Sequence, residues 1–355
     1  MPDKKLFILV NRLNITCGVS SHLFYFLQAM GDFAKDNIIL ITGGGNAVMK
    51  YEVLVRQVIV LPELQHETRS GAGFLKGIVR LRKFIKTYKP AIIHSHHFYS
   101  ANMAAYASVG LGIYRIQTVH ALIPPEGWLK HYNADTYIAV NEHILGGMMN
   151  SQINPSSVEL IRCGYHFKRV TRRTSAEGLK VITASRLIRD KGIDVLIAAV
   201  RLLGKDADLF SFTVAGSGRD EKEFRKQAEG LPVTFIGEVS DLPGRLEEYD
   251  ILVNPTRSKM EGFPTIIIQA AAQMLAVIST RFFGYQSRLN DDNSLLTDID
   301  DAAGVASALM ILHEDREYLQ QKQHRIFEEF QKDFELSGTL EQTKKLYIKC
   351  GGITW

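Results

Sequence analysis

Short apolar runs alternate with amphipathic stretches along the first half of the chain. The runs expected to form strands there are Leu6–Val10, Ile38–Thr42, Val58–Leu61, Ala91–His94, Tyr114–Val119, Tyr137–Val140 and Val158–Ile161. Helical patterns lie between them, as in Ser20–Met30, Gly77–Tyr88 and Ser100–Val109. This alternation predicts a parallel sheet with helices on both of its faces.

The same pattern starts again after a polar stretch, Lys168–Lys180, which we expect to be a linker. The elements expected after it are the strands Val181–Ala184, Phe212–Ala215, Thr234–Ile236, Ile251–Asn254 and Val277–Ser279 and a last helix near Leu340–Cys350. Because 355 residues exceed a usual single core, we predict an α/β protein with two doubly wound, Rossmann-like domains facing across a cleft. The predicted divisions are an N-terminal domain (1–170), a C-terminal domain (171–338) and a C-terminal helix (339–355) that packs toward the first domain.

Composition is typical of an ordinary soluble globular protein. The chain is 46% hydrophobic and 23% charged, and no run approaches the ~18 consecutive apolar residues of a membrane-spanning helix. The N-terminal stretch MPDKKLFILVNR lacks a signal-peptide cleavage site and predicts a first strand instead. The three cysteines are odd in number and far apart, which fits a reducing cytoplasm better than a disulfide framework.

Basic residues are concentrated in the first half. Residues 1–172 hold 19 Lys and Arg against 10 Asp and Glu, although the formal net charge of the whole chain is only +4. Much of the excess surrounds a helical apolar pattern in residues 74–89. This segment has two interpretations, a helix on an anionic membrane surface or a solvated helix packed on a sheet. Nucleic acid is disfavoured as a partner, because aromatic residues are not interleaved for stacking on bases.

The stretch from residue 258 to residue 274, SKMEGFPTIIIQAAAQM, combines a carboxylate with the expected start of a helix. The apolar run before it ends in Asn-Pro and is typical of a buried parallel strand. Glu261 lies in the loop at the carboxyl end of that strand, where open α/β sheets bind ligands. Pro264 suits a first helical turn, so the N–H groups of Thr265 and Ile266 would form an anion site.

Gln269 is a lone amide one turn into the same helix. On its own it is explained better as a hydrogen-bonded core amide than as a ligand contact. Arg186 and Lys191 precede another helical pattern and could hold a diphosphate. The Gly216–Gly218 turn is a weaker signal.

Further candidates follow other strands. Gly237 and Glu238 could place backbone groups near a base. Gly18 follows the first strand and would let backbone lie close to a phosphate. His120 ends an apolar strand and should lie at the cleft edge, where a lone histidine is more often structural than catalytic.

Two features superficially suggest a metal site. His94-Ser-His96-His97 ends a strand, but adjacent His96 and His97 diverge on an extended chain, and no Cys or carboxylate spacing supports zinc. Asp298-Ile-Asp300-Asp301 is a DxD string that could bind a divalent cation with a nucleotide sugar. Its position before a helical run fits helix capping better. Neither motif, taken by itself, therefore supports a metal site.

Several motifs in order resemble one enzyme family. ASRLIRDKGID, VAGSG, FIGEVSDLP, YDILVNPT and EGFPTIIIQAAA resemble the second domain of retaining GT-B glycosyltransferases of family four (glycosyl transferases group 1). CGVSSHLFYFLQAM, PAIIHSHHF, TVHA, NADTYIAVNEHI and IRCGYHF resemble its first domain and the domain junction. The resemblance covers nearly the whole chain and is specific in the second domain and diffuse in the first.

The resemblance implies a role for each matching residue. Glu261 would take the first acidic position of the family's E-x7-E motif and bind donor-sugar hydroxyls, and His120 would lie beside the transferred sugar. Gln269 would take the second acidic position, which binds the nucleotide ribose. The implied catalytic residues are Glu261 and His120, and the implied donor-binding residues are Gly18, Arg186, Lys191, Gly216, Gly218, Gly237, Glu238, Phe263, Pro264, Thr265, Ile266 and Gln269. Departures such as Gln for Glu at 269 and Cys17 for a glycine leave the donor nucleotide open.

The resulting prediction is a metal-independent, retaining hexosyltransferase in the cytoplasm, peripheral on the inner face of the cytoplasmic membrane. The expected donor is a nucleotide-sugar, a UDP-sugar first, and the expected acceptor is a glycan or lipid-linked glycan, as in bacterial surface polysaccharide or lipopolysaccharide assembly. The alternatives are a sugar-nucleotide epimerase of the same fold and a degenerate nucleotide-sugar-binding protein. A nicotinamide-dependent dehydrogenase is disfavoured by the missing glycine fingerprint.

Overall fold

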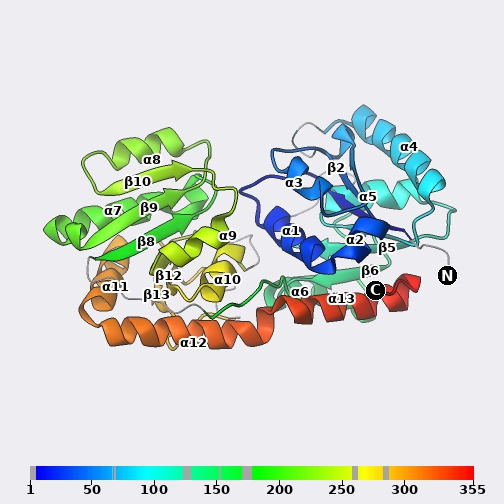
Figure 1. The fold of residues 1–355 in the computed structure, drawn as a ribbon. Coiled ribbons are helices and arrows are strands. Elements are labelled where there is room, and N and C mark those ends of the chain that lie inside the picture. Colours follow the sequence, from blue (N-terminus) through cyan, green and yellow to red (C-terminus); the bar gives the residue numbers. More distant parts are fainter. Residues whose placement is uncertain are drawn as a thin grey trace. The chain divides into compact units, whose positions relative to one another are not determined.

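The structure is a computed structural model of the chain. It describes residues 5–65, 67, 69–122, 129–151, 153–169, 178–257, 263–282 and 288–355. The chain forms two compact units, each built on a parallel sheet with helices packed against it (Figure 1). Unit 1 comprises Met1–Gly164 and Leu336–Trp355, and unit 2 comprises Tyr165–Glu335. The unit boundaries thus fall three to six residues before the predicted ones.

Unit 1 is built on a seven-stranded parallel sheet of order β3-β2-β1-β4-β5-β6-β7 within the described residues. Its strands are β1 (Leu6–Val10), β2 (Ile38–Thr42), β3 (Gln57–Val60), β4 (Ile92–Ser95), β5 (Tyr114–Val119), β6 (Thr136–Ala139) and β7 (Val158–Leu160). Its helices are α1 (Gly18–Met30), α2 (Asp32–Asn37), α3 (Val48–Glu52), α4 (Gly71–Tyr88), α5 (Phe98–Ala107), α6 (Glu142–Met149) and α13 (Leu336–Gly351), with short 3₁₀ turns η1 (Pro62–Leu64) and η2 (Pro155–Ser157).

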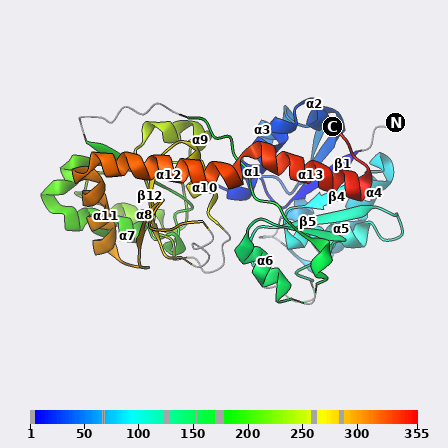
Figure 2. The ribbon, with the colours of Figure 1, turned by 90° about the horizontal axis from the view of Figure 1, so that it is seen from below.

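The central strands of unit 1 are apolar because both faces of the sheet are covered. All five residues of β1 and of β2 are buried, as expected for parallel strands between two helix layers. Residues Leu6, Ile8 and Val10 face the core shared with α1 and α13, and Phe7 and Leu9 face the core shared with α4 and α5. Figure 2 shows α13 lying along the sheet beside β1 and β4.

Unit 2 is built on a six-stranded parallel sheet, again counting described residues, of order β10-β9-β8-β11-β12-β13. Its strands are β8 (Leu179–Ala184), β9 (Phe210–Ala215), β10 (Val233–Gly237), β11 (Ile251–Asn254), β12 (Ala276–Thr280) and β13 (Leu295–Thr297). Its helices are α7 (Ile193–Leu203), α8 (Glu221–Gln227), α9 (Leu242–Arg245), α10 (Thr265–Ala272), α11 (Ala302–Glu314) and α12 (Arg316–Phe334), with 3₁₀ turns η3 (Arg189–Lys191), η4 (Gly204–Leu209) and η5 (Leu246–Glu248). Helices α7 and α11 share one core with the sheet, and α10 packs against α12.

The predicted α/β class and every predicted strand are confirmed, most of them within one or two residues. The edge strand β13, which has three residues, was not predicted. The expected linker falls largely on residues 170–177, which lie outside the described residues, and β8 begins at Leu179, before the expected end of the linker. Within the described residues, no helix combines the length and apolar character needed to cross a membrane.

Candidate nucleotide-sugar site

The strand order of unit 2 reverses between β8 and β11, so the loops after these two strands meet near the middle of the sheet's carboxyl edge. Such a switch point is where open α/β sheets bind ligands. The loop after β8 carries Arg186 and Lys191, and the loop after β11 leads into α10. Because α10 connects the parallel strands β11 and β12, its N-terminus lies at this same edge. The structure therefore brings the two predicted cations to the edge where α10 begins.

Backbone hydrogen bonds join these carboxyl-edge loops. The N–H of Leu187, after β8, donates to the carbonyl oxygen of Ser217, after β9, at 2.8 Å. The N–H of Arg257, after β11, donates to the carbonyl oxygen of Asp190 at 2.8 Å. Two separate segments, the loops after β9 and β11, thus support the loop that carries the two cations, which favours a preformed site over one assembled on binding.

Glycines allow the close approach of these loops. A Cβ at Gly216 would lie 1.9 Å from the carbonyl oxygen of Ser185, and one at Gly192 would lie 1.8 Å from that of Pro255. Both glycines have positive φ angles, 125° and 70°. A Cβ at Gly218 would also meet backbone of the loop after β8, at 2.2 Å. Gly216 and Gly218 therefore serve to pack the loop after β9 against the loop that carries Arg186.

The charged groups of this edge differ in exposure. Arg186 is exposed and Lys191 is half-buried. Glu238 follows β10 and is exposed, and its carboxylate accepts a hydrogen bond of 2.5 Å from the Ser217 hydroxyl. Gly237, with φ 70°, bonds through its carbonyl oxygen to the N–H of Gly216 at 2.7 Å. An arginine fork and a lysine beside a helix N-terminus form a site with the chemistry to bind a diphosphate.

Helix α10 begins as the sequence predicts. Pro264 is its N-cap, and the helix has no side-chain cap among the described residues. The N–H groups of Thr265 and Ile266 have no acceptor within the helix, because they belong to its first turn. Gln269 is buried, with 5% of its surface exposed. Its position one turn below the helix start fits both interpretations, a core amide and a ligand contact.

Two predicted site residues, Glu261 and Phe263, come just before α10 in the sequence. Glu261, predicted to be catalytic, lies outside the described residues. The ring of Phe263 packs among three aromatic side chains, with centroids 6.0, 5.8 and 6.1 Å from those of Phe282, Phe330 and Phe334. The side chain of Phe263 therefore anchors the start of α10 to α12, and only its backbone remains as a candidate for donor binding.

Unit 1 has its own switch point, between β1 and β4. Gly18 begins α1 directly after the loop that follows β1 and is half-buried. That loop packs closely on the loop after β2: the N–H of Leu13 donates to Gly44 O at 2.8 Å. A Cβ at Gly45 would lie 2.0 Å from the carbonyl oxygen of Leu13. The glycine run Gly43–Gly45 is thus explained by loop packing.

His120 follows β5 and is half-buried, but it does not stand alone. Its Nε2 lies 3.2 Å from Nδ1 of His96, and the rings of His94 and His22 lie nearby. Burial lowers the pKa of His22 to about 4 and that of His94 to about 3. It also holds the pKa values of His96 and His120 well below 6.5. All four imidazoles are therefore neutral at pH 7.

The two motifs that suggest metals have structural roles. His97 accepts a hydrogen bond from the N–H of Tyr99 and caps α5. Asp301 caps α11 by accepting from the N–H of Gly304 at 2.7 Å, which confirms helix capping as the role of this end of the DxD string. Over the part of the chain that the structure describes, no three His, Cys, Asp or Glu side chains are arranged to hold a metal ion.

Two family models match the chain in sequence order. The model described as Glycosyltransferase Family 4 matches residues 16–169, and the model described as Glycosyl transferases group 1 matches residues 178–315. The two matches together span most of both units. The chain belongs to glycosyltransferase family 4.

Known members of this group show what the chain resembles. It is 28% identical over 171 residues to a GalNAc-α-(1→4)-GalNAc-α-(1→3)-diNAcBac-PP-undecaprenol α-1,4-N-acetyl-D-galactosaminyltransferase of Campylobacter jejuni, covering 47% of each chain. It is 32% identical over 131 residues to a phosphatidyl-myo-inositol mannosyltransferase of Mycolicibacterium smegmatis, covering 35% of this chain and 33% of the relative. The matched segments thus span half or less of these two relatives.

Solved structures agree in fold. Anabaena HepE in complex with UDP and glucose superposes with a TM-score of 0.78 at 16% identity, over 97% of this chain and 99% of that chain. A glycosyltransferase of Rickettsia africae superposes with a TM-score of 0.79 at 17% identity, over 98% and 99%. The family-4 chain therefore has the GT-B fold, with two Rossmann-like domains.

Arg257 was not among the residues predicted from the sequence. Its side chain joins the loops after β8 and β11 at the switch point of unit 2. Its guanidinium donates two 2.8 Å hydrogen bonds to the Asp194 carboxylate at the start of α7, and it also bonds Asp300 and the Arg189 carbonyl oxygen. Hydrogen bonding to Asp194 raises the pKa of Arg257. These partners are 63, 43 and 68 positions away in sequence, so no local pattern indicates them.

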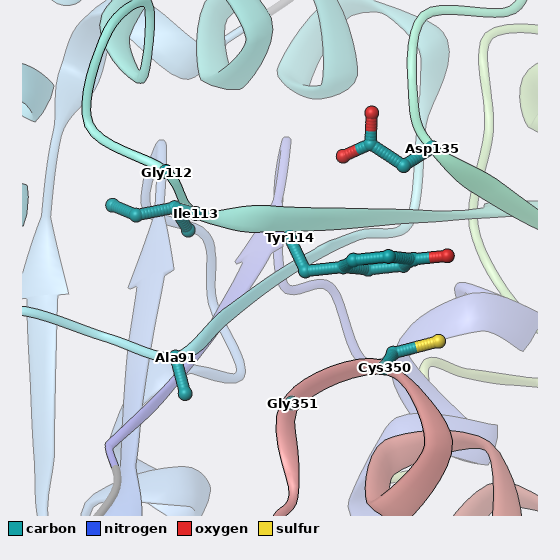
Figure 3. A pocket seen from close by; sticks show the side chains of 7 residues that line it. All are labelled: Ala91, Gly112, Ile113, Tyr114, Asp135, Cys350 and Gly351. Atoms are coloured by element: carbon teal, nitrogen blue, oxygen red, sulfur yellow. The ribbon is translucent and has the colours of Figure 1, made fainter.

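A surface pocket of about 540 Å³ lies elsewhere in unit 1 (Figure 3). Ala91, Tyr114 and Asp135 line it, together with Cys350 of α13. The first three stand at the starts of β4, β5 and β6, so the pocket lies at the amino edge of the sheet, away from the switch point. Its carboxylate, Asp135, is already paired with Arg115, and the candidate site of the family does not include this pocket.

Proposed function

We propose that this family-4 protein is a retaining glycosyltransferase that moves a sugar from a nucleotide-sugar, with a UDP-sugar as the expected donor, to a glycan or lipid-linked glycan. One observation supports the proposal most directly. Arg186, Lys191 and the start of α10 all lie at the carboxyl edge of the sheet of unit 2. The UDP and glucose named for HepE support the donor class, and the undecaprenol diphosphate named for the C. jejuni relative supports the acceptor class.

In the proposed reaction, the bond between the anomeric carbon and the diphosphate oxygen breaks. The acceptor hydroxyl forms a new bond to that carbon on the same face, which retains the configuration, and its proton passes to the departing diphosphate oxygen. Arg186, Lys191 and the first N–H groups of α10 stabilise the negative charge that develops on the departing diphosphate. Because these groups supply the positive charge, the proposal includes no metal and no other cofactor.

A thermal-shift screen with UDP, GDP, ADP and CMP and their common sugars tests the donor assignment. A ligand at a hundred times its Kd adds about 2.7 kcal/mol of stability, and we expect UDP and a UDP-sugar to give such a shift. A shift with none of the nucleotides would contradict the donor site. Incubation of the donor hit with extracted lipid-linked glycans then tests transfer. Donor conversion without an acceptor would indicate an epimerase, and binding without any conversion would indicate a degenerate binding protein.

We also propose that α4 places unit 1 on the anionic inner face of the cytoplasmic membrane. Leu75 and Val79 are exposed by 64% and 70%, and they lie one turn apart on the same face as the exposed Lys83 and Lys86. Apolar side chains beside lysines are the pattern of helices that lie in a lipid interface. This attachment would bring the enzyme to a lipid-linked acceptor.

Two of the basic residues of this segment have another role. Arg80 donates hydrogen bonds of 3.0 and 2.8 Å to the two carboxylate oxygens of Glu63, and Lys76 lies 3.3 Å from the same group. Although burial opposes it, hydrogen bonds from its own backbone, Arg80 and Lys76 keep the pKa of Glu63 below its usual value. The charges of Lys76 and Arg80 are therefore offset by Glu63, whereas Lys83 and Lys86 are exposed and lie outside this group.

The double substitution Lys83→Gln and Lys86→Gln should weaken binding to phosphatidylglycerol vesicles about 30-fold, because each lysine near an anionic surface contributes about 1 kcal/mol. Co-sedimentation measures this. The control is Lys222→Gln with Lys226→Gln on α8 of unit 2, which removes the same exposed charge from another helix. If the two double variants lost vesicle binding equally, or if neither lost any, the result would favour α4 as a solvated helix.

A further inference from the structure

Four histidines of unit 1, three of them buried and His120 half-buried, form one cluster at the carboxyl edge of the sheet. His94 and His96 lie two residues apart along and just after β4, so both point to the same face. His120 follows the neighbouring strand β5, and His22 comes from α1, which covers that face. The ring of His96 lies between those of His94 and His120, with centroids 4.5 and 5.5 Å away and interplanar angles of 26° and 21°.

One end of the cluster is fixed by hydrogen bonds. Nδ1 of His94 lies 2.6 Å from the hydroxyl of Tyr347 on α13, and its Nε2 lies 2.7 Å from the hydroxyl of Thr118 on β5. Both ring nitrogens of His94 are therefore paired, and its ring is held in place. Because the ring of His96 stacks on it, His94 also fixes the plane of His96.

The other end is a pair of imidazoles that constrain each other. Nδ1 of His96 and Nε2 of His120 are 3.2 Å apart, so one nitrogen must carry the proton and the other must accept it. His96 is buried, with 5% of its surface exposed, and its Nε2 has no hydrogen-bond partner among the described residues. A buried N–H without an acceptor is rarer in proteins than an acceptor without a donor. The proton of His96 is therefore placed on Nδ1, where it can be donated.

This arrangement determines the tautomer of His120. If His96 donates from Nδ1, then Nε2 of His120 accepts, and the single proton of neutral His120 resides on its Nδ1. We propose that His96 is a positioning residue that holds His120 as the Nδ1–H tautomer, so that His120 presents a hydrogen-bond donor to a substrate oxygen. The inference rests on the proposed function, in which His120 lies beside the transferred sugar.

Two substitutions of His96 separate this role from simple packing. His96→Asn retains an amide N–H near the position of Nδ1, whereas His96→Leu keeps much of the volume and has no donor. We expect kcat to fall about 10- to 100-fold in His96→Leu, as for a misoriented catalytic group, with the KM for the donor little changed. His96→Asn should recover most of the loss. Equal losses in the two variants, or no loss in His96→Leu, would overturn the proposal.

The tautomer is measured directly by long-range ¹H–¹⁵N correlation spectra of the histidine rings. We expect the pattern of an Nδ1–H imidazole for His120 in the native protein and in His96→Asn, and a change of that pattern in His96→Leu. An Nε2–H pattern in the native protein would overturn the proposal whatever the kinetics. This measurement needs no substrate, so it remains decisive if no transferase activity is found. The UDP thermal shift, which reports on unit 2, tests the proposed function separately.

Discussion

Replacing Arg186 or Lys191 with alanine should lower kcat for sugar transfer about 10²- to 10³-fold, the usual cost of removing one preorganised group that stabilises charge in a transition state. The negative charge on the diphosphate increases as the bond to the sugar breaks, so each cation contributes more in the transition state than in the bound donor. The KM for the donor should therefore rise less than kcat falls. Steady-state kinetics with a radiolabelled donor measure both constants.

The matched control is Lys205→Ala. Lys205 is an exposed cation of unit 2, but it lies in η4, which leads into β9 at the amino edge of the sheet. Its replacement should change kcat less than twofold. The kcat of Arg186→Lys should lie between that of the native protein and that of Arg186→Ala, because lysine keeps the charge but lacks the guanidinium fork. The assignment of the switch point as the diphosphate site is wrong if Lys205→Ala is as impaired as Lys191→Ala.

Acidification from pH 7 to pH 5 should lower the free energy of unfolding of unit 1 by at least about 4 kcal/mol, the sum for His22 and His94 alone. Burial lowers the folded-state pKa of His22 to about 4 and that of His94 to about 3, whereas unfolded histidines titrate near 6.5. Between these limits the unfolded state binds more protons, so stability rises with pH and is lost as pH falls below 6.5. Each histidine contributes about 1.4 kcal/mol per pH unit in that window. His96 and His120 act in the same direction.

Trp355 reports on this transition, because its ring stacks on Phe33 with centroids 4.8 Å apart in unit 1. In a Trp128→Phe background it is the only tryptophan of the chain, so urea titrations followed by fluorescence give the stability at each pH. His22→Phe should lower the pH dependence by about 1.4 kcal/mol per pH unit, the contribution of one buried neutral histidine, whereas His324→Gln, an exposed residue of α12, should leave it unchanged. An unchanged slope in His22→Phe would show that buried neutral histidines are not the cause.

The positions of the strands along the chain and the edge that carries the candidate site could be predicted from the sequence, because parallel strands buried on both faces appear as short apolar runs. Leu6–Val10, Ile38–Thr42, Tyr114–Val119 and Ile251–Asn254 were predicted with their observed bounds. The start of α10 at Thr265 also follows from a local signal, Pro264 before an apolar run.

Contacts between distant segments could not be predicted in this way. The sequence shows that His94 and His96 share a face of one strand, but not that the Tyr347 hydroxyl, 253 positions away, pairs with His94. It shows the basic pattern of α4, but not that Glu63 pairs with Arg80 and Lys76 and reduces the free charge of that helix. These pairs depend on how the chain folds back on itself, and a single sequence records no such proximity.

The C-terminal segment has a consequence for how the protein is made. Unit 1 is discontinuous in sequence: its last residues, Leu336–Trp355, follow the whole of unit 2. Leu346, Tyr347 and Ile353 complete the core around β1 and α1. On the ribosome, synthesis of the 171 residues of Tyr165–Glu335 takes roughly 10–35 s at typical elongation rates. During that time the first 164 residues are present without the segment that closes their core. Unit 2 can therefore fold as a continuous chain, while the core of unit 1 is completed only after Leu336–Trp355 has been synthesised.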